Sequence, residues 1–249
     1  MYNITKVLLE RYWQMKRETD LDEVKKNTMM LFDAVPIIPL EIGIVQHPFI
    51  ENIYMGIVNN HDKIEMIDIT QDENQTKYRD FVFQNIMNAP DVARIYMYVR
   101  SPWKLTWLMF VKKYMNEEDF AEYLADSWMS EENPNADVNV SIKTSIQWFK
   151  KANKQYLMNE KEFEIWKDLP DSFPIYRGVS VGRVSLGLSW TRNKEKAGWF
   201  QHRFDRSSQE GYLQRTLVRK ENVLAYFNSR GEEEIVVDVL AIKDKIEKL

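Results

Sequence analysis

The glycines of this 249-residue chain are unevenly placed, and their placement constrains the fold more than any other sequence feature. Only Gly43 and Gly56 come before residue 177, whereas the other six of the eight glycines follow it. Glycine supplies the positive-φ conformations that tight turns require. The sequence therefore predicts two differently built regions, with the turn-rich one at the C-terminal end.

The charge of the chain changes at the same place. Residues 1–170 carry 20 basic and 27 acidic side chains and residues 171–249 carry 14 and 11, so the formal charge changes from −7 to +3. Pro170 and Pro174 mark the change, because proline disfavours helix in the residue before it and lacks a backbone donor. We expect a helical N-terminal region over residues 1–170 and a second domain over residues 171–249.

The composition excludes several classes of protein. With no cysteine, the chain can have no disulfide framework, iron–sulfur cluster or thiol nucleophile. The net charge of −4 does not favour a nucleic-acid backbone as the dominant partner. The first twenty residues lack the apolar run of a secretory signal, and every apolar run is shorter than a membrane span. We therefore expect a cytoplasmic protein that does not enter a membrane.

Apolar residues recur at helical spacing through the first region. Phe120, Leu124 and Trp128 repeat at every fourth position, and Ser101 followed by Pro102 is typical of a helix start. Residues 64–70 fit a strand or a helix. The patterns predict helices over about residues 4–18, 22–33, 75–88, 102–115, 117–129, 138–152 and 159–168.

The aromatic and histidine side chains of this region do not by themselves indicate a ligand site. Large apolar residues at helical spacing belong to the core in most proteins, and we assign Trp103, Trp107, Trp128 and Trp148 to it. His47 precedes a proline and His61 lies in a polar stretch, so both are expected in surface loops. No group of side chains has metal-ligand spacing, and no metal is predicted.

After residue 174 the hydrophobic pattern changes to that of strands. Strands are predicted over residues 175–179, 213–218, 223–227 and 235–239, with one short helix over residues 193–200 that Asn193 caps. The expected fold class is α+β, with helices first and a compact, mainly β domain after them.

Two polar signals interrupt the apolar strands. Arg177 lies inside a strand, where a guanidinium must reach solvent, pair with a carboxylate or bind an anion; taken alone, the structural roles are favoured. Ser189 and Thr191 project from one face of a second strand and Trp190 from the other. Hydroxyls in strands are common, so this signal is weak on its own.

The third signal is a glutamate triplet that opens a strongly apolar strand. Glu232 and Glu234 are expected to share one strand face about 7 Å apart. An isolated triplet of this kind is usually a solvated strand end, but these acids begin the apolar run instead of ending it. Like charges so close raise each other's pKa unless cations compensate, and Arg177 and Arg230 are the available cations.

Together the three signals resemble the Arg-Ser-Glu class of mono-ADP-ribosyltransferases, in particular the small toxin-like members from bacteria and phages. The family's elements correspond here, in the right order, to Tyr176-Arg177, Ser189-Trp190-Thr191 and Glu232-Glu233-Glu234. The resemblance covers roughly residues 172–240, about a third of the chain, and carries no information on residues 1–170. It implies a split-β, NAD-binding catalytic domain over residues 171–249.

The resemblance also implies roles for individual residues, with NAD as the substrate and no metal. Arg177 would hold the NAD diphosphate, Ser189 and Thr191 would bind the ribose and fix Glu234, and Glu234 would stabilise the oxocarbenium ion. Glu232 would orient or deprotonate the acceptor. The catalytic set is then Glu234, Glu232, Arg177 and Ser189, and the NAD-binding set is Tyr176, Arg177, Gly178, Ser189, Trp190, Thr191, Trp199 and Phe200.

The implied function is transfer of ADP-ribose from NAD to a macromolecule, as a toxin of a toxin–antitoxin or phage-defence system whose partner would be an antitoxin protein. A protein arginine is the default acceptor, with RNA or a nucleobase as alternatives. Two other functions remain open: an NAD glycohydrolase, in which water replaces the acceptor, and a catalytically silent binding protein on the same fold.

Overall fold

The computed structural model describes residues 18–40, 43–58, 63–206 and 208–249. It combines helices with antiparallel sheets, which confirms the expected α+β class. The chain divides into two compact units, Met1–Phe120 (unit 1) and Ala121–Leu249 (unit 2). The division lies within helix α6 (Glu117–Ser130) and not near residue 170, where the composition changes.

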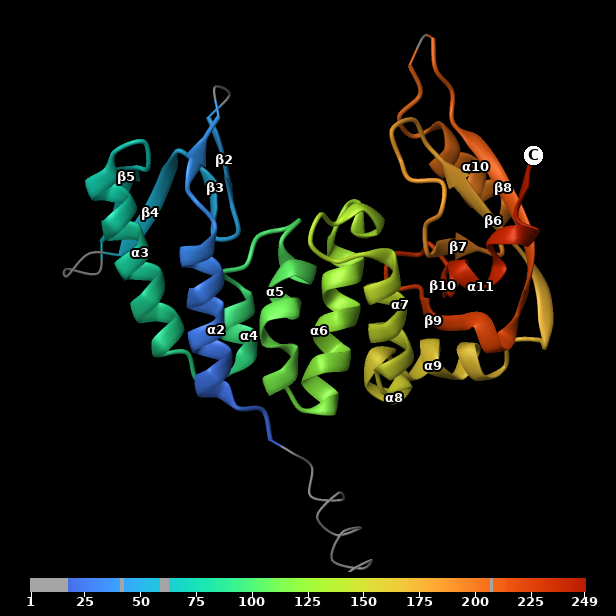
Figure 1. The fold of residues 1–249 in the computed structure, drawn as a ribbon, viewed down its shortest axis with the longest axis horizontal. Helices are drawn as coiled ribbons and strands as arrows, with labels where there is room; N and C mark the ends of the chain where they lie inside the picture. The colour runs from blue at the N-terminus through green and yellow to red at the C-terminus, as the bar shows by residue number, and fades with distance from the viewer. Residues whose placement is uncertain (1–17, 41–42, 59–62, 207) are drawn as a thin grey trace, which may run out of the picture. The chain divides into compact units, whose positions relative to one another are not determined.

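Unit 1 is built from helices and short antiparallel strands (Figure 1). The strand order of its first sheet is β1-β2-β3, and β4 and β5 form a separate two-stranded sheet. Within residues 64–70, which fitted a strand or a helix, residues 64–68 form strand β5. The elements are α2 (Leu21–Ala34), β1 (Ile38–Pro39), β2 (Ile44–His47), β3 (Ile50–Asn52), β4 (Tyr54–Val58), β5 (Ile64–Asp68), α3 (Asp72–Met87), α4 (Val92–Tyr96), α5 (Lys104–Val111) and the 3-10 turn η1 (Lys112–Tyr114).

The expected helices of unit 1 match α2 and α3 closely and α5 less well. Asp20 caps α2, because its carboxylate accepts a hydrogen bond from the backbone N–H of Glu23 at 3.1 Å. Helix α5 begins at Lys104, with Trp103 as its N-cap, and not at Pro102. The helix expected over residues 4–18 lies almost wholly outside the described residues.

His47 is the clearest correction in unit 1. It was expected in a surface loop, but it ends strand β2 and is buried against the rings of Phe32 and Phe49. Its Nε2 lies 3.1 Å from the carbonyl oxygen of Phe32, and its Nδ1 accepts from the N–H of Phe49 at 3.2 Å. This pattern fits the neutral Nε2–H tautomer. His61 lies outside the described residues.

Unit 2 contains one six-stranded antiparallel sheet and the helices that precede or interrupt it (Figure 1). The strand order is β11-β8-β6-β7-β10-β9. After α6 come η2 (Pro134–Ala136), α7 (Ile142–Lys151), α8 (Lys154–Leu157), α9 (Glu160–Lys167), β6 (Ser172–Val179), β7 (Ser189–Thr191), α10 (Lys194–His202), β8 (Tyr212–Arg219), η3 (Lys220–Asn222), β9 (Val223–Phe227), β10 (Glu234–Val237), α11 (Val239–Ile242), η4 (Lys243–Lys245) and β11 (Glu247–Lys248).

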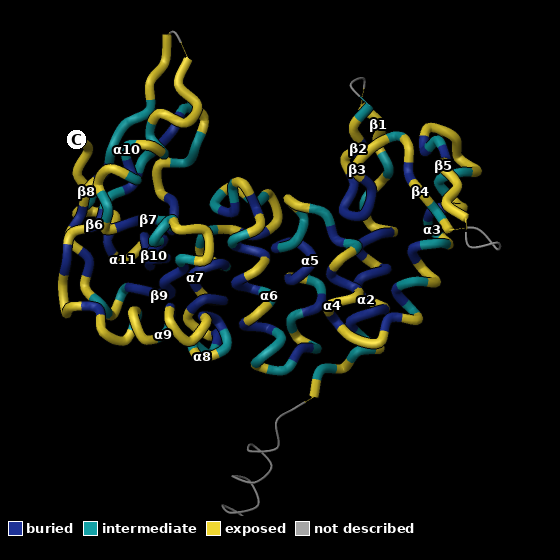
Figure 2. The backbone as a smooth tube through the Cα atoms, turned by 180° about the vertical axis from the view of Figure 1, so that it is seen from behind, coloured by how far each residue is buried: buried dark blue, intermediate teal, exposed yellow. Residues whose placement is uncertain are grey.

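The helices before residue 170 pack on the sheet, which is why the compact unit begins at residue 121. Helices α7 and α9 contact β9, and the rings of Phe149 and Phe227 lie 6.3 Å apart. The indole N–H of Trp166 donates to the carbonyl of Val223 at 3.2 Å. Strands β9 and β10 are buried along their whole length (Figure 2).

The four tryptophans assigned to the core differ in burial. Trp107, Trp128 and Trp148 are buried, as expected, whereas Trp103 is half-buried. The strand expected to reach Val239 ends at Val237, because Asp238 caps the short helix α11. Within the residues that the structure describes, no helix combines the length and hydropathy needed to cross a bilayer.

Candidate functional site

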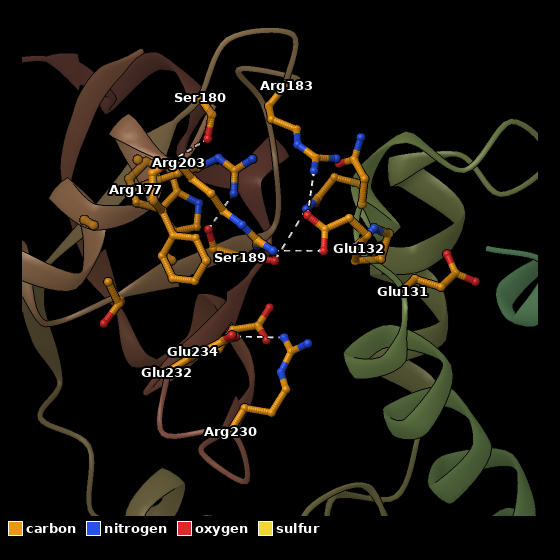
Figure 3. A pocket seen from close by; sticks show the side chains of 18 of the residues that line it. Glu131, Glu132, Arg177, Ser180, Arg183, Ser189, Arg203, Arg230, Glu232 and Glu234 are labelled. Atoms are coloured by element: carbon orange, nitrogen blue, oxygen red, sulfur yellow. Dashed lines mark hydrogen bonds and ion pairs between the residues drawn. The ribbon is translucent and has the colours of Figure 1, made fainter. Parts of the chain in front are cut away.

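A pocket of about 200 Å³ opens in unit 2, and most of the residues singled out in the sequence line it (Figure 3). Strands β6, β7 and β10 contribute to its wall, together with α10, the end of α6 and the loop after α6. Of the expected site residues, the pocket is lined by Tyr176, Arg177, Gly178, Ser189, Trp190, Thr191, Phe200, Glu232 and Glu234.

Strand order explains how distant sequence signals meet at this pocket. Strand β7 lies between β6 and β10. Thr191 is opposite Tyr176 on one side and opposite Glu234 on the other, and Ser189 is opposite Val236. Strands β6, β7 and β10, which carry Arg177, Ser189 and Glu234, are therefore adjacent.

Arg177 is almost enclosed, with 9% of its surface exposed. Its Nη1 donates to the carbonyl of Ser189 at 2.7 Å and its Nη2 to the carbonyl of Val184 at 3.2 Å. A Cβ atom at Gly187 would lie 2.3 Å from Nη2, so glycine is needed for the guanidinium to fit. Arg177 thus stabilises the loop between β6 and β7, and it also lines the pocket.

Burial disfavours the charged form of Arg177. Burial lowers the pKa of Arg177 to about 10, and the opposite charge of Glu234 acts to raise it. Its buried Nε–H has no hydrogen-bond partner among the described residues. An unsatisfied donor of a buried cation is costly unless a ligand or water completes it.

Glu234 is the buried acid of the pocket, with 9% of its surface exposed at the first position of β10. The indole N–H of Trp128, on α6, donates to its Oε1 at 2.9 Å. Burial raises the pKa of Glu234, whereas hydrogen bonds from Ser189 and Trp128 and the charge of Arg230 act to lower it. The carboxylate is therefore oriented by two donors within a poorly solvated wall.

The hydroxyls of β7 have different partners. The side-chain amide of Asn135 donates to Oγ of Ser189 at 3.4 Å, and Ser189 also hydrogen-bonds Glu234. Oγ1 of Thr191 accepts from the N–H of Asn193, the N-cap of α10, at 3.1 Å. The buried Trp190 donates its indole N–H to the carbonyl of Gly187 at 2.9 Å, which fixes its ring against the loop before β7.

Glu232 and Glu234 do not share a strand face, contrary to the expectation. Strand β10 begins only at Glu234, and Glu233 has a φ of 52°. That left-handed conformation follows Gly231, whose φ is 70°, so the chain turns sharply before the strand. Glu232 lies in this turn at the pocket edge and pairs with Arg230 at 2.7 Å.

Trp199 and Phe200, two of the aromatic residues expected at the NAD site, differ in their relation to the pocket. Phe200 lines the pocket, but Trp199 is not among its lining residues and is 59% exposed. Trp199 instead lies beside the Arg203 guanidinium, which is 5.5 Å from the ring centre. Gly178 permits the close packing of α10, because a Cβ there would meet the Ala197 carbonyl oxygen at 2.1 Å.

Sequence reasoning missed several residues of this pocket, among them Trp128, Asn135, Glu132, Arg183 and Arg203. Trp128 and Asn135 hold the acid and the serine, and Glu132 forms ion pairs with Arg183 and Arg203. Trp128 had been assigned to the core on its helical spacing. No local pattern marks the other four, because their partners are more than 50 positions away.

The pocket contains no set of metal ligands. Throughout the described residues, no group of three or more histidine, cysteine, aspartate or glutamate side chains could hold a metal ion.

Comparisons of the chain with protein-family models, with curated proteins and with solved structures found no match.

Proposed function

We propose that unit 2 is a mono-ADP-ribosyltransferase that cleaves the nicotinamide bond of NAD and transfers ADP-ribose to a macromolecule. One observation carries the proposal: Arg177, Ser189 and the buried Glu234, which belong to three adjacent strands, line a single pocket. Buried, strongly perturbed ionisable groups in a cleft are typical of functional sites.

The proposed reaction breaks the bond between C1′ of the ribose and the pyridinium nitrogen of NAD. The bonding electron pair leaves with nicotinamide, and the ribose passes through an oxocarbenium-like state. A negative group held beside that state stabilises it most in a poorly solvated site. Glu234, which Trp128 and Ser189 orient, is suited to this role.

Glu232 is suited to serve the acceptor. It lies at the pocket edge, and its side chain is more exposed than that of Glu234. The nucleophile would form the new bond to C1′ and lose its proton to the Glu232 carboxylate. The ion pair with Arg230 holds that carboxylate in place.

The size of the pocket limits which part of NAD it can enclose. Sites for drug-sized ligands usually measure about 300–1,000 Å³, and this cavity measures about 200 Å³. The nicotinamide riboside end would fit inside. The diphosphate and adenosine would then lie towards the mouth.

The experiment is incubation of the whole chain with NAD labelled in its adenylate part, with and without bacterial lysate. We expect release of nicotinamide and a labelled macromolecule, and separate digestion with protease and nuclease identifies its class. Free ADP-ribose without a labelled macromolecule would favour the glycohydrolase. No nicotinamide release under any condition contradicts the proposal.

A further inference from the structure

Three charged side chains meet at the pocket wall, and one of them bridges the other two (Figure 3). Oε1 of Glu132 accepts from Nη2 of Arg183 at 2.9 Å, and Oε2 accepts from Nη2 of Arg203 at 3.2 Å. Each oxygen of one carboxylate therefore binds a different arginine. This is also how two arginines hold a phosphate group.

Both arginines also contact aromatic rings. The Arg183 guanidinium lies 4.9 Å and the Arg203 guanidinium 5.2 Å from the centre of the Phe204 ring. Arg203 also lies beside the ring of Trp199. Stacking on an aromatic ring restrains a guanidinium independently of its anionic partner, so the two arginines are suited to bind another anion at the same place.

The carboxylate in this site is easily displaced. The side chain of Glu132 is 56% exposed, and the side chains of Arg183 and Arg203 are 21% and 36% exposed. Ion pairs with this much solvent contact contribute little to stability. A diphosphate carries more charge and more acceptor oxygens than one carboxylate, so it competes well for the same donors.

Arg177, to which the resemblance assigns the diphosphate, has few free donors for it. Two of its three nitrogens are already bound to backbone carbonyls, and it is almost enclosed. Among the lining cations, Arg230 is paired with Glu232 beside the proposed acceptor position. Arg183 and Arg203 are the remaining arginines of the lining.

We propose that Arg183 and Arg203 form a subsite for the diphosphate group of the ligand, and that the Glu132 carboxylate occupies it until the ligand displaces it. The assignment of that ligand as a dinucleotide rests on the proposed function. Glu132 is then an internal competitor. The apparent affinity for the ligand is then the intrinsic affinity multiplied by the fraction of molecules in which Glu132 has left the subsite.

The test is calorimetric titration of the whole chain with ADP-ribose, which contains the diphosphate but no nicotinamide bond. We expect Glu132→Gln to bind ADP-ribose about three- to tenfold more tightly than the wild type, because the competitor is gone. Arg183→Gln and Arg203→Gln should each bind roughly tenfold more weakly. Adenosine, which has no phosphate, should not distinguish the variants.

Glu164→Gln is the matched control. Glu164 is 55% exposed, pairs with Lys167 on α9 and does not line the pocket. Like Glu132→Gln, the Glu164→Gln substitution removes one negative charge from unit 2. Equal ADP-ribose affinity of the Glu132 and Glu164 variants would overturn the inference, because a general charge effect would then explain any gain.

Failure of this inference and failure of the proposed function can be told apart. If folded arginine variants bind ADP-ribose as the wild type does, or if the wild type does not bind it at millimolar concentration, the subsite is wrong. Nicotinamide release from NAD is measured separately on the wild type. Its absence, with the binding pattern intact, removes the proposed reaction and leaves the diphosphate subsite.

Discussion

The two units treat buried polar groups differently. In unit 1, His47, Thr28 and Tyr78 are buried, and each lies within hydrogen-bonding distance of a backbone carbonyl: Phe32, Val24 and Phe49 respectively. In unit 2, the β6–β8 pair buries Arg177, Gln214 and Thr216, and one atom of each has no partner among the described residues: Nε, Oε1 and Oγ1.

The difference concerns the cost of burying polar groups in each unit. Satisfied buried hydrogen bonds complete a core, whereas buried charges and unsatisfied atoms reduce stability. Arg177 and Gln214 are opposite each other in the β6–β8 pair, so two of the incomplete groups are neighbours. Deviations of this kind are expected at functional sites.

The largest effect that we expect separates the two glutamates of the pocket. Glu234→Gln should reduce nicotinamide release at least about a hundredfold, since loss of a preorganised charge at the reacting centre raises the barrier by roughly 3 kcal/mol. Glu232→Gln should lose transfer to the acceptor and keep residual NAD hydrolysis. Measured rates of both reactions, with circular dichroism to confirm folding, check this.

Retention of wild-type activity by Glu234→Gln would show that unit 2 buries this carboxylate for another reason. Equal behaviour of the two variants in both assays would also contradict the division of roles.

The second effect is an opposite response of the two units to acid. Burial lowers the pKa of His47 to about 4 from 6.5, so the unfolded chain binds this proton more tightly than the folded one. Unit 1 should therefore lose up to about 3 kcal/mol of stability as the pH falls from 6.5 to 4. Protection from hydrogen exchange in residues 44–58, corrected for intrinsic rates, measures this.

Glu234 has the opposite sign, because burial raises its pKa above 4.5. Its contribution to the stability of unit 2 is present below pH 4.5 and is lost as the pH rises through its folded pKa. Protection in residues 223–237 should therefore gain from mild acid. His47→Gln and Glu234→Gln should each remove the response of one unit alone, and parallel responses of both units would contradict the assignment.

A third comparison uses one strand glycine from each unit. A Cβ at Gly178 in β6 would lie 2.1 Å from the Ala197 carbonyl oxygen, whereas one at Gly56 in β4 would have contacts of 3.4 Å or more. Gly178→Ala should destabilise unit 2 by about 1–3 kcal/mol through overpacking. Gly56→Ala should be neutral or stabilise unit 1 by up to about 1 kcal/mol. Urea unfolding of both variants measures the difference, and equal effects would refute the close packing of α10 on β6.

The smallest effect concerns the surface of unit 1. Arg79 binds both carboxylate oxygens of Asp33, at 2.7 and 2.9 Å, and both side chains are substantially exposed. Asp33→Asn should destabilise unit 1 by only about 0.5 kcal/mol at low salt and by less at high salt. A loss that is large and insensitive to salt would show that unit 1 depends on this ion pair far more than its exposure indicates.

The sequence predicted the helices better than the short strands. Helices α2, α3, α6 and α9 lie within a few residues of their expected positions, because spacing and capping residues are local signals. Strands β1 to β4 were missed. They have two to five residues each, too few for alternation to be recognised.

The residues of the candidate site that lie in strands were predictable from the sequence. Arg177, Ser189 and Glu234 stand out against apolar runs, so their types and positions were visible in the sequence. Glu132, Arg183 and Arg203 are ordinary surface residues by pattern, and their meeting depends on the fold of unit 2. The start of the compact unit 2 was not visible in the sequence for a related reason, since composition does not reveal that α7 and α9 pack on β9.

The hydrogen bond from Trp128 to Glu234 has a spectroscopic consequence. Excitation of an indole moves electron density away from its five-membered ring, so a negative charge beside the N–H lowers the energy of the emitted light. Protonation of Glu234, or a cationic ring bound next to it, should shift the emission of Trp128 to the blue. The difference between the spectra of the wild type and Trp128→Phe isolates this signal from the other seven tryptophans, so the chain carries its own label-free fluorophore for the charge of its buried acid.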